Sequence, residues 1–333
     1  MHIVAAPDKF KGTATAAQIA GAVTSAAVES GHTSTEVPLA DGGEGTLEAL
    51  GGGNRTSTVT GPLGDPVVAK WRLENGVGVI EMAQSSGLVL AGGPKGNDPM
   101  AATTAGVGEL IAQAVDGGAT SIIIGVGGSA TTDGGLGAID VLGSGQRLRG
   151  VDVIVACDVR TRFTAAAAVF GPQKGATRAQ VTMLGNRLEA LVDTYKERFG
   201  VDVSALDRAG AAGGLAGGLA AIGARLVDGF DVVAEHVGLE AVLESADLIV
   251  TGEGFIDDES FDGKVVGGVA RLAQLHEVPV LAVAGQVFDG AQDRIDAISL
   301  ADSCGLDRAL EAPESCVHEV LRRHFSEATG EVR

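Results

Sequence analysis

Four lysines of this sequence lie in short turns that also contain glycine. Lys9 and Lys11 lie in DKFKGT, Lys174 in GPQKGAT and Lys264 in DGKVVGG. Backbone N–H groups beside glycine and a nearby ammonium group together bind the oxygens of a phosphate. The chain has 24 Lys and Arg against 43 Asp and Glu, so cations in these turns indicate an anionic ligand. The alternative is a general preference of lysine for loops.

Acidic residues form a second set in glycine-rich loops. They are Asp41 and Glu44 in LADGGEGT, Asp133 in GGSATTDGG, and Glu253 and Asp257 in TGEGFID. Each loop follows an apolar strand or precedes a helix, and ligands of open α/β sheets collect at the carboxyl ends of strands. Carboxylates in such loops hold Mg²⁺ beside phosphates or orient an attacking hydroxyl. Ordinary turn formation is the alternative for one loop, whereas three such loops favour a site.

Other catalytic patterns are missing from the sequence. It contains neither the P-loop pattern GxxxxGK[ST] nor the HRD motif of protein kinases. The turn GVGGSA, with Gly125, Gly127 and Ala130, imitates a dinucleotide-binding fingerprint weakly, so a nicotinamide-dependent oxidoreductase is one alternative. The histidines lie outside the glycine-rich motifs, which leaves acid–base chemistry to carboxylates. They are His2, His32, His236, His276, His318 and His324.

Composition excludes several classes of partner. The formal net charge is −19, which opposes binding to nucleic acids and to anionic membranes, and aromatic residues make up only 3%. The most extended apolar stretch, at 209–224, is too short and too rich in Ala and Gly to cross a bilayer. The three cysteines, Cys157, Cys304 and Cys316, show no metal-ligand spacing. We therefore expect a cytoplasmic protein that binds a small molecule and leave its oligomeric state open.

The pattern of apolar residues predicts an α/β fold. At each end of the chain, strands alternate with helices, as in a doubly wound parallel sheet, and residues 55–82 predict an antiparallel meander. Thr13 or Thr15 is expected to cap the first helix. The expected strands are 2–6, 34–38, 121–126, 152–157, 246–252, 278–285 and 296–301, and the expected helices are 14–29, 103–118, 178–199 and 209–224. Five of these strands, two N-terminal and three C-terminal, are expected to form one parallel sheet, with a second mixed α/β domain inserted in the chain.

Taken together, the motifs resemble those of the bacterial type I glycerate kinases. The similar segments are IVAAPDKFKGT, PLADGGEGT, GPLGDPV, IEMAQSSGL, IIIGVGGSATTDGGLGA, VACDV, AVFGPQKGAT, GAAGGL, ADLIVTGEG and GKVVGGVA. They occur in the order of that family and span residues 3 to about 285.

The resemblance implies a flavodoxin-like domain with an inserted mixed α/β domain that is similar to restriction endonucleases. The expected boundaries are 1–45 plus 235–333 for the first domain and 46–234 for the inserted one, with the active site in the cleft between them. The implied activity is phosphorylation of D-glycerate by ATP with Mg²⁺, giving 2-phosphoglycerate. A kinase that gives 3-phosphoglycerate or acts on a related hydroxy acid is the alternative.

The resemblance also suggests a role for each candidate residue. Asp8 or Asp41 is expected to be the base, and Lys11, Lys174 and Lys264 to bind triphosphate oxygens or the substrate carboxylate. The backbone N–H groups of Gly127, Gly128 and Ser129 are expected to cradle phosphates. Glu253, with Asp257 or Asp133, is expected to hold the Mg²⁺ that accompanies ATP.

Some departures from the family pattern bear on substrate and activity. Phe255 follows TGEG where a polar or basic residue is usual, Glu259 and Ser260 replace a Gln-Thr pair, and the loop after CDV reads RTRFTA from Arg160 to Ala165. The segment between GGSAT and VACDV is also shorter than usual. A nucleotide-binding homologue without catalytic activity is therefore a further alternative.

Overall fold

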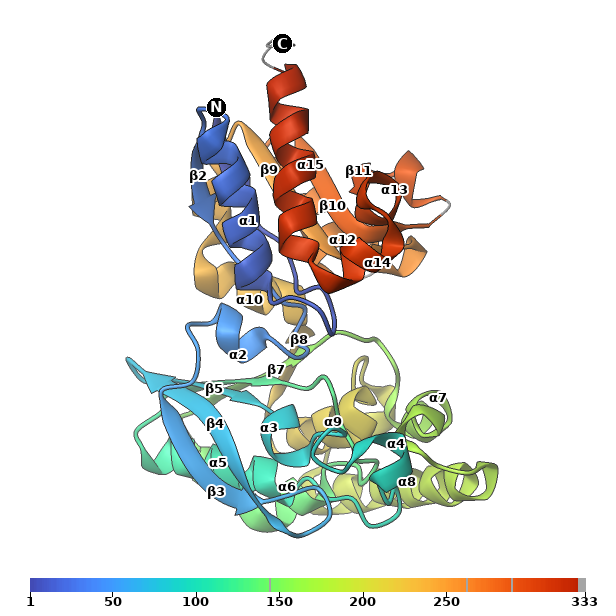
Figure 1. Ribbon diagram of the computed structural model, residues 1–333. Helices are drawn as coiled ribbons and strands as arrows, with labels where there is room; N and C mark the ends of the chain where they lie inside the picture. Colours follow the sequence, from blue (N-terminus) through green and yellow to red (C-terminus); the bar gives the residue numbers. More distant parts are fainter. Residues whose placement is uncertain (144, 262, 289, 329–333) are drawn as a thin grey trace. The chain divides into compact units, whose positions relative to one another are not determined.

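The computed structural model describes residues 1–143, 145–261, 263–288 and 290–328. The chain divides into two compact units (Figure 1). Unit 1 contains Met1–Asp41 and Phe230–Arg333, and unit 2 contains Gly42–Gly229. We describe each unit by itself.

The core of unit 1 is a parallel sheet of five strands. Its strand order is β11-β10-β9-β1-β2, and each neighbouring pair is parallel. The strands are β1 (His2–Ala5), β2 (Thr33–Glu36), β9 (Leu248–Ile256), β10 (Val280–Val287) and β11 (Asp296–Ser299). The predicted five-stranded parallel sheet is therefore confirmed. Numbered along the unit, this order is 2-1-3-4-5, one of the two common doubly wound orders.

Helices cover both faces of this sheet. Successive residues of β10 point to opposite sides, so Leu281 and Val283 join one apolar cluster, and Ala282 and Ala284 join another. On the first side α1 packs against α15, and the two lie side by side in Figure 1. The helices of this unit are α1 (Ala16–Glu29), α10 (Gly229–Val237, whose first residue belongs to unit 2), α11 (Leu239–Leu243), α12 (Val265–Leu275), α13 (Leu300–Cys304), α14 (Leu306–Glu311) and α15 (Pro313–Ala328).

A capping box begins α1. Thr15 is the N-cap, its side chain accepts a hydrogen bond from the Gln18 N–H, and the Gln18 side chain accepts one from the Thr15 N–H. This reciprocal pair satisfies two N–H groups of the first turn. Of the two caps expected from the sequence, the structure selects Thr15.

Unit 2 contains a mixed sheet of six strands. Its order is β3-β4-β5-β6-β7-β8, antiparallel from β3 to β5 and parallel from β5 to β8. The predicted antiparallel meander is thus confirmed. The strands are β3 (Arg55–Thr60), β4 (Pro66–Glu74), β5 (Val77–Glu81), β6 (Ser121–Gly125), β7 (Asp152–Cys157) and β8 (Arg225–Asp228). The fold class predicted from the sequence, α/β with a doubly wound parallel sheet and a second mixed α/β part, is confirmed.

Helices of unit 2 pack in layers on its sheet. One apolar cluster joins the strands to α5, α6 and α9, and a second cluster, built around Phe163 and Tyr195, joins α7 and α8 to this layer. The helices are α2 (Thr46–Ala49), α3 (Ala83–Ser86), α4 (Gly93–Gly96), α5 (Ala105–Asp116), α6 (Leu136–Leu142), α7 (Ala166–Phe170), α8 (Arg178–Phe199) and α9 (Leu215–Ala221).

The structure corrects one predicted helix and adds one strand. The continuous helix expected at 209–224 is wrong, because Ala212, with φ of 54°, and the two glycines after it adopt left-handed backbone. A short 3-10 turn and α9 replace it, and β8 follows at a position where no strand was expected. In the part of the chain that the structure describes, no helix combines the length and apolar character needed to cross a membrane.

Candidate active site

The strand order of unit 1 changes direction between β1 and β9. The chain passes from β1 to β2 on one side and later adds β9, β10 and β11 on the other. Beyond the carboxyl end of β1, the Asp8 N–H donates to the Gly252 carbonyl at 2.8 Å, and the Leu39 N–H donates to the Pro7 carbonyl at 2.9 Å. These backbone bonds bring the segments that carry Asp8, Asp41 and Glu253 together. A doubly wound sheet binds its ligands at such a point.

Asp8 is a buried carboxyl group in this cluster. Its residue is only 5% exposed, and burial raises the pKa of Asp8 to about 7. The Lys9 ammonium, 3.6 Å from Oδ1, and the Lys9 N–H, which donates to Oδ1 at 2.7 Å, lower the pKa, whereas Asp41 and Glu253 raise it. A carboxyl that titrates near neutrality is suited to accept a proton from a substrate hydroxyl.

Glu253 carries an oxygen without a hydrogen-bond partner. The residue lies in β9, is 9% exposed, and its buried Oε1 accepts no hydrogen bond from the described residues. Burial raises the pKa of Glu253, whereas the Ser260 side chain and the Lys264 ammonium lower it. An unsatisfied buried carboxylate oxygen is costly, so it indicates a position that a bound cation or a ligand hydroxyl fills.

The Asp257 and Ser260 pair holds the segment that follows β9. The Ser260 N–H donates to Asp257 Oδ1 at 3.1 Å, and the Asp257 N–H donates to Ser260 Oγ at 3.2 Å. Ser260 belongs to the 3-10 helix η6 (Asp258–Phe261) and is buried. The pair therefore fixes the Ser260 side chain close to Glu253, where it lowers the pKa of that carboxyl.

Of the predicted lysines of unit 1, Lys264 acts on the same carboxylates and Lys11 lies beside the turn after Glu253. Lys264 is the N-cap residue of α12, and its ammonium lies 5.6 Å from the centre of the Phe255 ring. Its charge favours the ionised form of Glu253, which places it in the cluster. Lys11 is exposed, and its backbone N would lie 3.4 Å from a Cβ added at Gly254, so it is next to the TGEG turn.

In unit 2 the loop after β6 presents unpaired N–H groups. Among the described residues, the N–H groups of Gly127, Gly128 and Ser129 donate no hydrogen bond, whereas the next one, of Ala130, donates to Ser86 O at 2.9 Å. Gly128 has a φ of +70°, and a Cβ at Gly127 would lie 2.5 Å from Gly43 Cα, so both positions require glycine. Successive N–H groups in such a turn form a concave anion site.

A buried glutamate on the strand next to β6 holds the segment that packs against this loop. Glu81, at the end of β5, accepts hydrogen bonds at Oε1 from the N–H groups of Gly45 and Leu47, each at 2.8 Å. The supported segment includes Gly43, which packs against Gly127. Burial raises the pKa of Glu81, and the two N–H groups lower it.

Asp133 lies at the centre of a dense hydrogen-bond network. Its Oδ2 accepts from the N–H and hydroxyl of Thr104, at 2.9 and 2.8 Å, and from the Gly137 N–H at 3.2 Å. Its Oδ1 accepts from the Gly135 N–H at 3.0 Å. With four donors on its two oxygens, this carboxylate fixes the start of α5 and α6 and has little remaining capacity for a metal ion.

Lys174 lies beneath the same loop and is 2% exposed. Its ammonium group donates to Ser129 Oγ and to the Thr131 carbonyl, each at 2.7 Å. The structure therefore brings together Lys174, Asp133, Ser129 and the glycines in unit 2. It groups Asp8, Lys11, Asp41, Lys264, Glu253 and Asp257 in unit 1.

Sequence reasoning assigned no role to Glu81 or Asn97. Glu81 ends a strand and accepts from the N–H groups of Gly45 and Leu47, and Asn97 donates to the Lys174 carbonyl. The described residues contain no group of three His, Cys, Asp or Glu side chains arranged to hold a metal ion. Mg²⁺ in phosphoryl-transfer enzymes needs only one or two carboxylates beside substrate phosphates and water.

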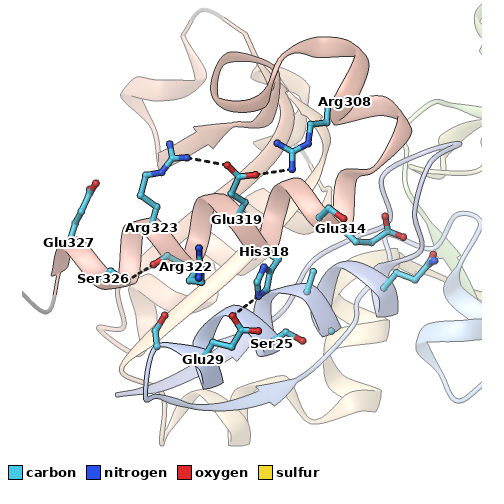
Figure 2. A pocket seen from close by; sticks show the side chains of 15 residues that line it. Ser25, Glu29, Arg308, Glu314, His318, Glu319, Arg322, Arg323, Ser326 and Glu327 are labelled. Atoms are coloured by element: carbon cyan, nitrogen blue, oxygen red, sulfur yellow. Dashed lines mark hydrogen bonds and ion pairs between the residues drawn. The ribbon is translucent and has the colours of Figure 1, made fainter. Parts of the chain in front are cut away.

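A groove of about 1060 Å³ between α1 and α15 contains none of the predicted site residues (Figure 2). Several of its charges form pairs: Glu319 binds Arg308 at 2.8 Å and Arg323 at 3.2 Å, and His318 lies 3.1 Å from Glu29. The lining contains more glutamate than arginine side chains, so it offers no excess positive charge to a small anion.

Comparison with known proteins points to one family. A model of the glycerate kinase family matches residues 3–146 and 139–326. The chain is 39% identical to the glycerate 2-kinase of Escherichia coli (strain K12) over 93% of each chain. It is 40% identical to the glycerate kinase of Bacillus subtilis (strain 168), over 86% of this chain and 85% of that one. A crystal structure from Salmonella typhimurium LT2, provisionally named glycerate kinase 2, superposes with a TM-score of 0.84 and 36% identity over the whole of both chains.

The family model and the glycerate kinase relatives show that the chain is an enzyme of the kinase class. The chain belongs to the glycerate kinase family.

Proposed function

We propose that this protein transfers a phosphoryl group from ATP to the 2-hydroxyl of D-glycerate, giving 2-phosphoglycerate. The observation that carries the proposal is the buried Asp8 carboxyl at the direction change of the sheet, in a member of the glycerate kinase family. The relative from Escherichia coli bears the name glycerate 2-kinase, which supports the 2-hydroxyl as the acceptor. The cysteines are free thiols in the structure, which agrees with the cytoplasm as its location.

Asp8 is the proposed base. Its carboxylate takes the proton of the glycerate hydroxyl as that oxygen bonds to the γ-phosphorus, while the bond from phosphorus to the leaving ADP oxygen breaks. Asp8 then releases the proton to solvent. Phosphoryl transfer requires mainly positioning and charge stabilisation, so one carboxylate is sufficient for the proton. Asp41 is the alternative base, because its charge is close enough to raise the pKa of Asp8.

The remaining residues bind and orient the two substrates. We assign the triphosphate to the N–H groups of Gly127, Gly128 and Ser129, and the carboxylate of glycerate to Lys264 and Lys11. N–H groups at glycine form short bonds to phosphate oxygens, and ammonium groups add charge without fixing a plane.

The residues of unit 1 fit a bound Mg²⁺. Glu253 has a buried oxygen without a partner, and Asp257 lies in the same cluster, so these two side chains would hold the ion. When bound, Mg²⁺ neutralises phosphate charge during transfer. Asp133 is the weaker candidate because four donors already occupy its oxygens.

The test is to incubate the purified protein with ATP, Mg²⁺ and D-glycerate and to identify the product by phosphorus NMR. We expect 2-phosphoglycerate, with L-glycerate as the control for stereochemistry. Formation of 3-phosphoglycerate would overturn the position of transfer and keep the kinase. Failure to form either product would show that D-glycerate is not the substrate.

One observation favours a second candidate, a kinase for a related hydroxy acid with an apolar substituent. Phe255 is 45% exposed, packs edge to face with Phe288, and lies next to Lys264. An exposed aromatic pair beside a cation suits an acid that carries both a carboxylate and an apolar group. A larger kcat/KM for such an acid than for D-glycerate would establish this alternative.

A further inference from the structure

Lys174 is a buried cation without an ion pair. Among the described residues no carboxylate lies within ion-pair distance of its ammonium, although the charge of Asp133 acts on it from farther away. Its hydrogen bonds go instead to the Ser129 hydroxyl and the Thr131 carbonyl, each at 2.7 Å. A buried ammonium is costly, and two neutral acceptors do not cancel its charge. The structure thus places a buried amino group, whose pKa is lowered by burial, beneath the loop of Gly127, Gly128 and Ser129.

This contact determines what Ser129 can offer. The ammonium group has only donors, so Ser129 Oγ must accept from it, and the hydroxyl hydrogen remains available for another acceptor. Within the described residues Ser129 Oγ donates to no other group. The N–H groups of Gly127, Gly128 and Ser129 are also unpaired. Three backbone donors and one hydroxyl donor therefore belong to one short turn.

Lys174 is itself held in place. The Asn97 side chain donates to the Lys174 carbonyl at 2.9 Å and to the Ala130 carbonyl at 3.0 Å, which ties the lysine backbone to the loop. A Cβ at Gly175 would collide with the Pro94 carbonyl, so the chain after the lysine packs tightly against α4. The ammonium lies 5.9 Å from the centre of the Phe170 ring. With both its ends fixed and 98% of its surface covered, the side chain has no free path to a ligand.

We propose that the Ser129 hydroxyl binds a phosphoryl oxygen of the donor substrate, and that Lys174 is a positioning residue that orients this hydroxyl and adds its charge from beneath without touching the ligand. The ligand class is a phosphate ester or polyphosphate. The inference rests on the proposed function in assigning the triphosphate to this loop. It differs from the expectation that Lys174 binds phosphate oxygens directly.

The charge of Lys174 also predicts a dependence on pH. Burial lowers the pKa of Lys174 to about 7, and Asp133, the ionisable side chain among the described residues that acts on it, raises the pKa. A phosphate above the loop favours the ammonium form, so binding draws a proton onto Lys174 near neutral pH. The affinity for phosphate should therefore fall as the pH rises through about 7, beyond the change due to the ligand's own ionisation.

The test measures binding of ATP and of inorganic tripolyphosphate by calorimetry to the full chain and to Ser129→Ala, Lys174→Met and the double variant. Each single change should weaken binding about tenfold or more, because each removes a hydrogen bond or charge acting on an anion. The double variant should bind about as weakly as the weaker single variant, since both changes remove the same contact. The KM for the acceptor should not change. Ser57→Ala, which removes another partly buried hydroxyl of unit 2, is the matched control.

A pH series separates positioning from loss of structure. The wild-type affinity should contain a step near pH 7 that is missing in Lys174→Met, and Lys174→Arg should not restore it, because guanidinium stays charged. If Ser129→Ala binds both probes as the wild type does, or if the double variant shows the product of the two single losses, the proposal is overturned. Wild type that binds tripolyphosphate without phosphorylating glycerate would overturn the proposed function and leave this inference standing.

Discussion

The buried carboxylates of the two clusters differ in how fully their oxygens are hydrogen-bonded. In unit 1, Glu253 retains an oxygen without a partner, and Asp8 has neighbouring carboxylates that raise its pKa. In unit 2, the Asp133 carboxylate accepts hydrogen bonds from four donors. A buried carboxyl with a raised pKa or an unpaired oxygen is typical of groups that exchange protons or hold ions. A carboxylate with a full set of hydrogen bonds is typical of groups that fix the local structure. Unit 1 therefore has the character of the chemical cluster and unit 2 that of the rigid binding cluster.

This contrast has a measurable consequence for stability. Neutralising a strained carboxyl in unit 1 should impair catalysis and stabilise the fold, because a buried charge with poor compensation is removed. Neutralising a satisfied one in unit 2 should destabilise the fold, because its donors lose their acceptor.

The largest effect is expected for Asp8→Asn. If Asp8 is the base, kcat should fall by roughly 10²–10⁴-fold. The wild-type rate should rise with pH through about 7, where Asp8 loses its proton, and this rise should be missing from the variant. Steady-state kinetics from pH 5.5 to 8.5 measure both. Asp307→Asn, at an exposed position of α14, is the control and should leave the rate unchanged.

Asp8→Asn should also change stability with a defined sign. The folded pKa of about 7 exceeds the ordinary 3.8, so between these values the native state binds more protons than the unfolded state, and wild-type stability falls as pH rises. The advantage in Tm of the variant should therefore grow from pH 4 to pH 7.5. A Tm difference that is the same at both pH values would show that Asp8 is not strained.

The next effect concerns Lys264. Replacing it by Ala should lower kcat/KM at least about tenfold, since an ammonium that binds an anionic substrate contributes 1.5 to 3 kcal/mol. It should also raise the pKa of Glu253, because the ammonium now lowers it. Kinetics with D-glycerate as the varied substrate provide the measurement, and exposed Lys70→Ala is the control. An unchanged rate would remove Lys264 from the site.

Sequence patterns predicted the sheet of unit 1 well because their signals are local. Apolar runs between polar turns indicated the three C-terminal strands, and Thr15 with Gln18 forms the expected capping pair. The Ala- and Gly-rich stretch at 209–224 misled because Ala and apolar spacing favour a helix, whereas packing against the Thr131 region imposes a left-handed turn at Ala212 and Gly213. Tertiary contacts there override local propensity.

The sequence indicated which residue types belong to the site, but it did not reveal their burial or their hydrogen-bond partners. A lysine in a glycine-containing turn is expected to be exposed and to bind an anion, and Lys11 is exposed as expected. Lys174 has the same local pattern but is covered by segments as distant as Asn97, which no local spacing reveals. Asp133 likewise resembles a metal ligand until Thr104, 29 residues earlier, satisfies it.

Asp133→Asn tests whether the fully hydrogen-bonded carboxylate of unit 2 stabilises the fold. An amide oxygen can replace only one of the two carboxylate oxygens, so donors from Thr104, Gly135 or Gly137 are left unsatisfied. We expect the free energy of unfolding to fall by about 3 kcal/mol. Urea denaturation measures this, with exposed Asp140→Asn as the control. A variant as stable as the wild type that has lost Mg²⁺ dependence would instead make Asp133 a metal ligand.

The smallest effect should come from Glu81→Gln, which separates charge from hydrogen bonding. Glu81 accepts from Gly45 and Leu47 through the same oxygen, Oε1, so a glutamine carbonyl oxygen can accept both bonds. Burial raises the pKa of Glu81, so the charge itself is unfavourable, and its loss offsets the weaker bonds of a neutral acceptor. Unfolding free energy should therefore change by less than about 1 kcal/mol, whereas Glu81→Ala, which leaves both N–H groups unpaired, should cost about 1–3 kcal/mol. If Glu81→Gln and Glu81→Ala destabilise the protein equally in urea denaturation, the charge of Glu81 and not only its hydrogen bonds stabilises the loop of unit 2. The proposed difference between the two units would then be wrong for this residue.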